Sequence, residues 1–101
     1  MEKLHKITEA SRIFKVLADP TRLSILQMLE GKELNVTAIS QGLDMEQSAV
    51  SHQLKTLKDA RLVKARRDGK SMIYSQLDGH VYEVLAQMFT HVSEGIEEET
   101  D

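Results

Sequence analysis

The 101-residue sequence predicts a mainly helical α+β domain with one small β-hairpin, in the order α-α-α-α-β-β-α. Apolar residues recur at intervals of three and four in five segments, as they do on the buried face of an α-helix. Between the fourth and fifth segments, residues 62–77 form two runs rich in β-formers around Asp68-Gly69. No repeat or linker divides the chain, so we expect one domain over residues 1–96 and an acidic tail over residues 97–101.

Two helices are predicted at the start of this domain. The apolar spacing from Leu4 to Leu17 predicts the first over residues 3–17. Asp19 followed by Pro20 is typical of the start of the second helix. An Asp side chain can accept a hydrogen bond from a free N–H of the first turn, and Pro at the first helical position has no N–H that would need a partner. Gly31 can adopt the left-handed conformation that ends a helix, so the second helix is expected to stop close to it.

Two further helices, a hairpin and a last helix follow. Asn35 is predicted to cap a short third helix that ends near Asp44, and the fourth helix is predicted over residues 47–60. Asp68-Gly69 predicts a type I′ turn between the two strands, because this turn favours residues that tolerate positive φ. The last helix is expected over residues 79–94 or slightly beyond, where apolar residues again recur every three or four positions.

The charge of the chain is distributed unevenly along the sequence. The formal net charge is −3, but residues 94–101 contain five acidic residues and no base. Residues 52–70 contain seven Lys and Arg against two Asp. A local basic stripe of this kind is typical of a surface that binds nucleic acid, although a solvated, salt-bridged surface gives the same pattern.

The third and fourth predicted helices, joined by a tight turn and followed by the basic hairpin, form a winged helix-turn-helix. In this fold the second of these two helices lies in the major groove of DNA, while cations of the hairpin reach phosphates or the minor groove. The alternative for the polar side chains is a plain exposed surface, and Glu46 in the capping position places a negative charge close to the DNA. The candidate DNA-binding residues are Gln47, Ser48, Ser51, His52 and Lys55 on the helix and Lys64, Arg66, Arg67 and Lys70 on the hairpin.

Three segments of the sequence resemble the ArsR/SmtB family of bacterial metal-sensing repressors: LADPTRLSIL at 17–26, QSAVSHQLKTL at 47–57 and LVKARRDGKSMIYS at 62–75. The resemblance covers nearly the whole chain. It implies a winged-helix homodimer, joined through its first and last helices, that occupies operator DNA and is released by an inducer. The Cys-x-Cys sensor of some members would fall at residues 35–37, where this chain has no Cys, so sensing through that site is excluded.

The last helix and the residue before it carry a second pattern, made of Asp78, His80, His91 and Glu94. His80 and His91 would lie on one face of the helix but about 16.5 Å apart along its axis, too far to share a metal ion. A second copy, antiparallel across a two-fold axis, would bring His80 to the other chain's His91 and Asp78 to its Glu94. Each dimer would then hold two sites of two imidazoles and two carboxylates, which suit tetrahedral zinc, with cobalt(II) as a substitute.

The alternative for these four residues is a solvated surface, but all four positions match the pattern of the family's zinc site on its last helix. The resemblance therefore implies a repressor whose metal-free dimer binds its operator and which zinc releases, so that metal efflux or homeostasis genes are derepressed. It also places a backbone carbonyl near Arg61 as the acceptor of a hydrogen bond from the His91 nitrogen that does not bind zinc.

Other functions remain open at this stage. A repressor of the same fold could respond to cobalt, to nickel or to no metal, and a nucleic-acid-binding or interaction module could hold a purely structural zinc. An enzyme is not expected and no catalytic residue is predicted, because four protein ligands close the zinc shell. With no apolar stretch long enough for a membrane span, we expect a cytoplasmic protein without a membrane partner or a small organic ligand.

Overall fold

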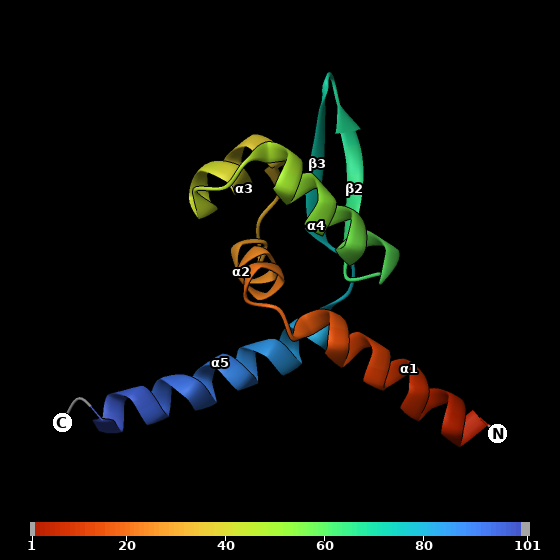
Figure 1. The fold of residues 1–101 in the computed structure, drawn as a ribbon, viewed down its shortest axis with the longest axis vertical. Coiled ribbons are helices and arrows are strands. Elements are labelled where there is room, and N and C mark those ends of the chain that lie inside the picture. Colours follow the sequence, from red (N-terminus) through yellow and green to blue (C-terminus); the bar gives the residue numbers. More distant parts are fainter. Residues whose placement is uncertain (1, 100–101) are drawn as a thin grey trace.

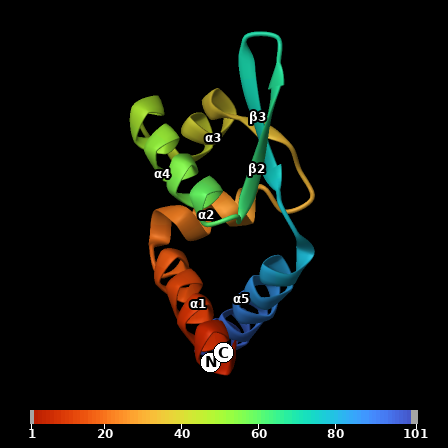
Figure 2. The ribbon, with the colours of Figure 1, turned by 90° about the vertical axis from the view of Figure 1, so that its right-hand side faces the viewer.

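The computed structural model describes residues 2–99, with side chains to residue 96, and confirms the predicted winged helix-turn-helix (Figure 1). The elements are α1 (Glu2–Leu17), α2 (Pro20–Met28), β1 (Leu34–Asn35), α3 (Val36–Leu43), α4 (Gln47–Asp59), β2 (Val63–Asp68), β3 (Ser71–Gln76) and α5 (Gly79–Glu99). Helices α2, α3 and α4 form the body beside the hairpin, and α1 and α5 extend from its base (Figures 1 and 2).

Polar side chains define the helix starts that the sequence predicts. The Asp19 carboxylate accepts a hydrogen bond from the backbone N–H three residues later, at 3.0 Å, and so caps α2. The Asn35 side chain caps α3 in the same way, at 2.8 Å. Asp44, with φ 53° and ψ 50°, ends α3 in the left-handed region, and Gly31 adopts φ 67° after α2. These four predictions are confirmed.

Helix α4 begins and ends in less usual ways. Glu46 occupies its N-cap without a side-chain hydrogen bond to the first turn. At the other end, Arg61 adopts a φ of 62°, and its N–H donates to the Lys58 carbonyl at 3.0 Å. The N–H of Leu62 donates to the Leu57 carbonyl at 2.9 Å, which completes a Schellman motif. Arg61 therefore holds the left-handed position that Gly usually occupies.

The sheet contains one strand and one turn that the sequence did not predict correctly. Strand β3 pairs antiparallel with both β2 and β1, in the order β1-β3-β2. With only two residues, β1 is too short to produce an alternating pattern. Asp68 and Ser71 pair, so Gly69-Lys70 is the two-residue loop, and only Gly69 has a positive φ, of 64°. The predicted type I′ turn is wrong, because that turn needs positive φ at both central residues, and the observed arrangement fits type II′.

The buried core lies between the helix-turn-helix and the base of the sheet. Val50, Leu54 and Leu57 from α4 are fully buried, as are apolar side chains of α2 and α3. Helix α5 contributes Tyr82 and Leu85 from its first half only. The helix then continues to Glu99, past its predicted end and into the predicted acidic tail, whose residues 100–101 lie outside the described part.

Replacing Arg61 with Gly should stabilise the fold. A left-handed residue with a Cβ costs about 1–2 kcal/mol, and Gly costs about 0.5–1 kcal/mol in unfolded-chain entropy, so Arg61→Gly should raise the free energy of unfolding by about 0.5–1 kcal/mol. Urea denaturation at one fixed protein concentration measures the change. Arg61→Ala is the control, because it removes the same charge and keeps the Cβ. An equal gain in both variants would contradict this explanation.

Candidate nucleic-acid interface and metal ligands

The turn between α3 and α4 fixes how the candidate recognition helix is presented. The N–H of Met45 donates to the Ser40 carbonyl at 3.0 Å and closes the turn. The side-chain amide of Gln47 donates across it to the Thr37 hydroxyl at 3.3 Å. Gln47 therefore supports the helix-turn-helix as well as facing solvent at the start of α4.

One face of α4 is buried and the other is free to meet a ligand. Its apolar residues are fully buried, while Ser48, Ser51, His52 and Lys55 are all exposed. Spacings of three and four residues place these four side chains on one side of the helix. Lys55 also pairs with Asp59 at 3.2 Å, but both side chains are well exposed, and such a pair is weak enough to open for a phosphate.

The two arginines of the wing, the β2–β3 hairpin, lie on opposite faces of β2, because side chains alternate along a strand. Arg67 shares its face with Val63, which is buried against the core beside α4. Arg66 shares the other face with Lys64 and donates to the Glu33 carboxylate at 3.1 Å. This contact lowers the pKa of Glu33 and raises the pKa of Arg66, through the hydrogen bond first and the opposite charge second.

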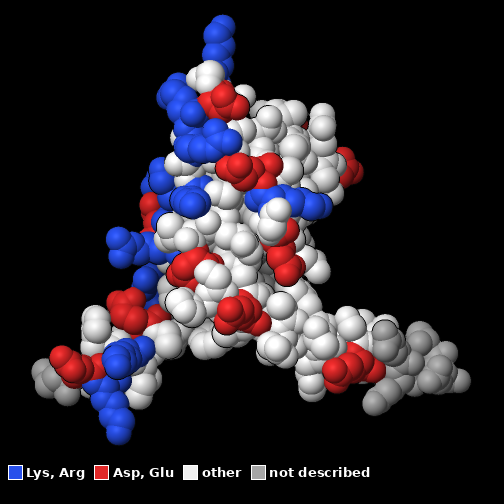
Figure 3. Space-filling model, turned by 180° about the vertical axis from the view of Figure 1, so that it is seen from behind, with Lys and Arg blue, Asp and Glu red and all other residues white. Residues whose placement is uncertain are grey.

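The exposed cations of α4 and the wing form a basic edge, with acidic side chains between some of them (Figure 3). In Figure 3, Lys and Arg side chains follow one side of the molecule from the tip of the hairpin downward. Lys70 lies at this tip, in the turn between the strands. All nine candidate DNA-binding residues are therefore exposed on α4 or the wing, although Arg66 faces away from Arg67.

Helix α5 holds the candidate metal ligands in two pairs. Asp78 caps the helix, since its Oδ1 accepts from the His80 N–H at 2.9 Å, and the His80 Nδ1 lies 3.6 Å from the same oxygen. His91 and Glu94 lie three residues apart on the exposed second half of the helix. Within the described residues, no three His, Asp or Glu side chains gather closely enough to hold a metal ion. A single chain therefore brings together Asp78 and His80 but not all four ligands.

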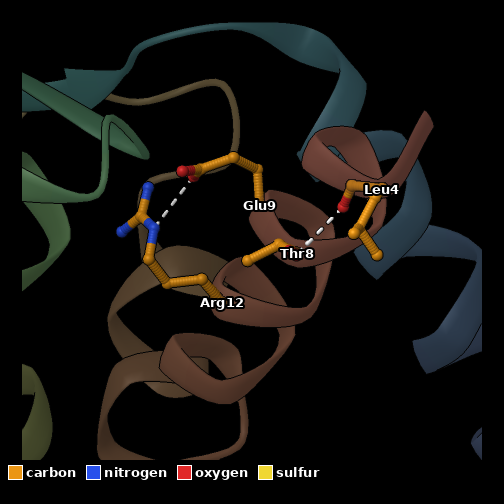
Figure 4. A network of polar contacts seen from close by, with 4 residues as sticks. All are labelled: Leu4, Thr8, Glu9 and Arg12. Carbon is orange, nitrogen blue, oxygen red and sulfur yellow. Dashed lines mark hydrogen bonds and ion pairs between the residues drawn. The ribbon is translucent and has the colours of Figure 1, made fainter. Parts of the chain in front are cut away.

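Helices α1 and α5 each leave an apolar face uncovered. On α1, Leu4, Ile7 and Phe14 are 60–65% exposed, although each is large and apolar. Two side-chain hydrogen bonds also lie within this helix: Thr8 donates to the Leu4 carbonyl at 2.9 Å, and Arg12 to Glu9 at 3.0 Å (Figure 4). On α5, the uncovered residues are Val84, Met88, Val92 and Ile96.

An apolar hollow of about 240 Å³ lies where α1 meets α5. Six apolar residues line it: Ala10, Ile13, Phe14, Leu17, Val81 and Val84. The hollow joins the uncovered faces of the two helices into one surface.

Comparison with known proteins identifies the family. The model of the "Bacterial regulatory protein, arsR family" matches residues 19–65. The chain is 37% identical over 91 residues to the "Transcriptional repressor SmtB homolog" of Synechocystis sp., covering 90% of this chain and 69% of that protein. The chain belongs to the arsR family.

Solved structures of arsR-family regulators share the fold. The homodimeric winged helix-turn-helix DNA-binding domain of Mb0332 from Mycobacterium bovis, a possible ArsR-family regulator, has a TM-score of 0.86 and 31% identity, covering 95% of this chain and 89% of that one. The AntR antimony-specific transcriptional repressor has a TM-score of 0.82 and 34% identity, covering 90% and 83%. This arsR-family chain is thus a DNA-binding transcriptional regulator and not an enzyme. None of its helices within residues 2–99 has the length and apolar character needed to cross a membrane.

Sequence reasoning missed two residues that hold this arsR-family fold in position. Glu33 lies far from Arg66 in sequence, and nothing local indicates their pairing. Tyr82 is 7% exposed on α5, and its hydroxyl donates to the Leu62 carbonyl at 3.0 Å. Burial, and then the nearby Asp78 carboxylate, raise the pKa of Tyr82, so the hydroxyl stays a donor. The sequence offers one signal for this bond: Tyr82 lies on the apolar face of a predicted helix, and a buried Tyr hydroxyl usually needs a hydrogen-bond partner.

Removing the Glu33 carboxylate should release Arg66 for DNA. Glu33→Gln is expected to raise the affinity for random-sequence DNA by about two- to five-fold and to steepen the logarithmic salt dependence by about one unit, as expected for one additional phosphate contact. Fluorescence anisotropy over a range of salt concentrations measures both quantities. Glu30→Gln is the matched control, because exposed Glu30 forms no ion pair with any residue in 2–96. Identical salt slopes in the two variants would show that Arg66 does not reach a phosphate.

Proposed function

We propose that this chain is a metal-responsive transcriptional repressor whose metal-free homodimer binds operator DNA and which zinc releases. Residues 1–96 would carry both DNA binding and dimerisation, and release would derepress genes of metal efflux or homeostasis. One observation carries the proposal: α5 presents two separated ligand pairs beside an uncovered apolar stripe. Each pair is half of a site, and the stripe is the surface that a second copy would cover.

The position of the ligands around α5 supports a shared site. At about 100° per residue, Val84 lies about 40° from His80 and about 20° from His91 around the helix axis. The ligands therefore border the apolar stripe along its length. Two α5 helices packed antiparallel through this stripe would bring His80 and Asp78 of one chain opposite His91 and Glu94 of the other.

The free energy of burial supports dimerisation. The four uncovered apolar residues of α5 are 48–56% exposed, and those of α1 more so. Burying a large apolar side chain gains about 1.5–3 kcal/mol when complete, so covering both faces favours association strongly. The Mb0332 domain, with the same fold, is a homodimer.

The donor set favours zinc over the softer metals. The chain has no Cys, so any site must use nitrogen and oxygen. Two imidazoles and two carboxylates fit tetrahedral zinc, and cobalt(II) accepts the same donors. Asp78 uses Oδ1 to cap α5, which leaves Oδ2 to bind the metal without loss of the cap. AntR, a similar repressor, is antimony-specific, which supports a metal as the inducer class but not this particular metal.

The geometry of the dimer connects metal to DNA. Ligands from two chains bind one zinc tightly only when the α5 helices hold one relative position, so zinc selects one dimer geometry. Operator binding needs two recognition helices about 34–36 Å apart. A dimer held in another geometry loses contacts at one or both half-sites, and the DNA is released.

Zinc should therefore dissociate the wild-type protein from operator DNA. We expect sub-micromolar free zinc to weaken binding by about 10- to 100-fold, within the usual range of coupling between two sites. Titrating zinc, cobalt and nickel into the complex while following fluorescence anisotropy measures this response. His5→Ala is the control, because exposed His5 on α1 is outside the ligand set. Indifference to all three metals would contradict the proposal, and a response to nickel alone would reassign the metal.

Mixed dimers test whether His80 and His91 meet across the subunits. His80→Ala and His91→Ala homodimers should each lack one ligand in both sites and bind zinc weakly. A dimer with one chain of each kind has one doubly damaged site and one intact site, so refolding the variants together should restore one tight site per mixed dimer. Calorimetry measures the stoichiometry, and mass spectrometry confirms exchange of subunits. A mixture that binds no more zinc than the separate variants would exclude a shared site.

A further inference from the structure

Leu62 connects three parts of the molecule. Its N–H donates to the Leu57 carbonyl at 2.9 Å and so ends α4. Its carbonyl accepts from the Leu77 N–H at 3.4 Å, just after β3, and from the Tyr82 hydroxyl of α5 at 3.0 Å. The end of the recognition helix, the base of the wing and α5 are therefore bound to one residue.

Tyr82 provides the directional part of this connection. Leu85 also buries its side chain against the core, but apolar packing has no preferred orientation and tolerates small rotations. A hydrogen bond to a carbonyl restricts both the distance and the angle. Within residues 2–96, Tyr82 supplies the only side-chain hydrogen bond from α5 to the body. Its aromatic ring is buried, and the hydroxyl alone reaches the backbone.

The carbonyl of Leu62 has no acceptor position left for another donor. A carbonyl oxygen offers two lone pairs, and Leu77 and Tyr82 use both. The family resemblance implies that the His91 nitrogen that does not bind zinc donates to a backbone carbonyl near Arg61, and Leu62 is the next residue in the chain. In this conformation the Leu62 carbonyl accepts from Tyr82 of the same chain, so the bond that links α5 to the end of α4 lies within one subunit.

We propose that Tyr82 is a positioning residue whose hydroxyl sets the angle between α5 and the DNA-reading unit, which consists of α3, α4 and the wing. Because the exposed apolar face of α5 is the surface that the second subunit would cover, this angle would determine the spacing of the two recognition helices in the dimer. The inference rests on the proposed function, in which the dimer binds two half-sites. Without the hydroxyl, only a fraction of dimers hold the correct spacing, and the apparent affinity falls to that fraction of its wild-type value.

Tyr82→Phe tests the inference because it removes one hydroxyl and keeps the ring. The matched control is Tyr74→Phe, since Tyr74 is half-buried on β3 and its hydroxyl makes no hydrogen bond within residues 2–96. The DNA is an operator selected by wild-type protein from a random duplex library. Three derivatives are compared with it: one with the second half-site scrambled, and two with the half-sites one base pair closer or farther apart. Binding is measured without metal, at a temperature where circular dichroism shows every variant folded.

For Tyr82→Phe we expect affinity for the full operator to fall by about five- to ten-fold, while affinity for the single half-site stays within about two-fold of wild type. Discrimination between correct and altered spacing should fall by a similar factor, and Tyr74→Phe should match wild type in every measurement. A loss of folded protein alone would reduce both affinities equally and leave spacing discrimination unchanged.

Two results would overturn the inference for Tyr82 itself. One is wild-type spacing discrimination in Tyr82→Phe, and the other is an equal loss of affinity for the full operator and the half-site. A wild-type protein that shows no preference for two half-sites over one would instead refute the proposed dimeric binding, and the inference with it. The wild-type measurement therefore separates the two failures.

Discussion

Helix α5 packs only its first half against its own subunit, and this division of one helix constrains the rest of the molecule. Tyr82 and Leu85 are buried in the core, while the apolar residues from Val92 onward lie beyond the body and are exposed. A helix that leaves such a stripe in water is incompletely stabilised by its own chain. The same helix therefore contributes to its own core, exposes an apolar surface and carries the candidate metal ligands, and its periodicity of 3.6 residues separates these features around the axis.

The electrostatics of the chain follow from where its charges are placed and not from their sum. The net charge of −3 coexists with a basic edge over α4 and the wing, because acidic residues concentrate at the end of α5, which contains no Lys or Arg. Two cations of the basic edge pair with acids on the protein surface. Exposed pairs of this kind are weak, so they can adjust the affinity for DNA without blocking it. Charge placement therefore separates the candidate DNA-binding surface from the acidic end of α5 within one small domain.

The recognition helix is fixed at both ends by different means. At its start, the α3–α4 turn and the Gln47 bond to Thr37 compensate for a cap that Glu46 does not provide. At its end, the left-handed Arg61 and the bonds to Leu62 stop the helix and attach it to the wing and α5. The end of α4 is thereby bonded to the residue that also binds α5, while Ser48 in its first turn remains exposed to solvent.

The sequence by itself determined the helices, their caps and the wing, because these depend on neighbours in the chain. Asp19, Asn35 and Asp44 act on N–H and carbonyl groups within a few residues, and apolar periodicity identifies the face each helix buries. The candidate DNA-binding and metal-ligating residues could also be named from spacing and resemblance. The structure places these residues at exposed positions on α4, the wing and α5 or directly before α5, and their roles, the shared zinc site included, stay predictions.

Only the tertiary structure decided the features that join distant segments. Strand β1 exists because Leu34 lies beside Tyr74, and the Glu33 pair with Arg66 likewise joins residues that are 33 positions apart in the sequence. The bond from Tyr82 to Leu62 depends on how α5 returns to the core, which no local pattern specifies. The left-handed Arg61 is likewise a product of packing, since intrinsic preference disfavours that conformation and the surrounding hydrogen bonds offset the cost. Local propensity encodes contacts a few residues apart, whereas these contacts form only after the core has brought separate elements together.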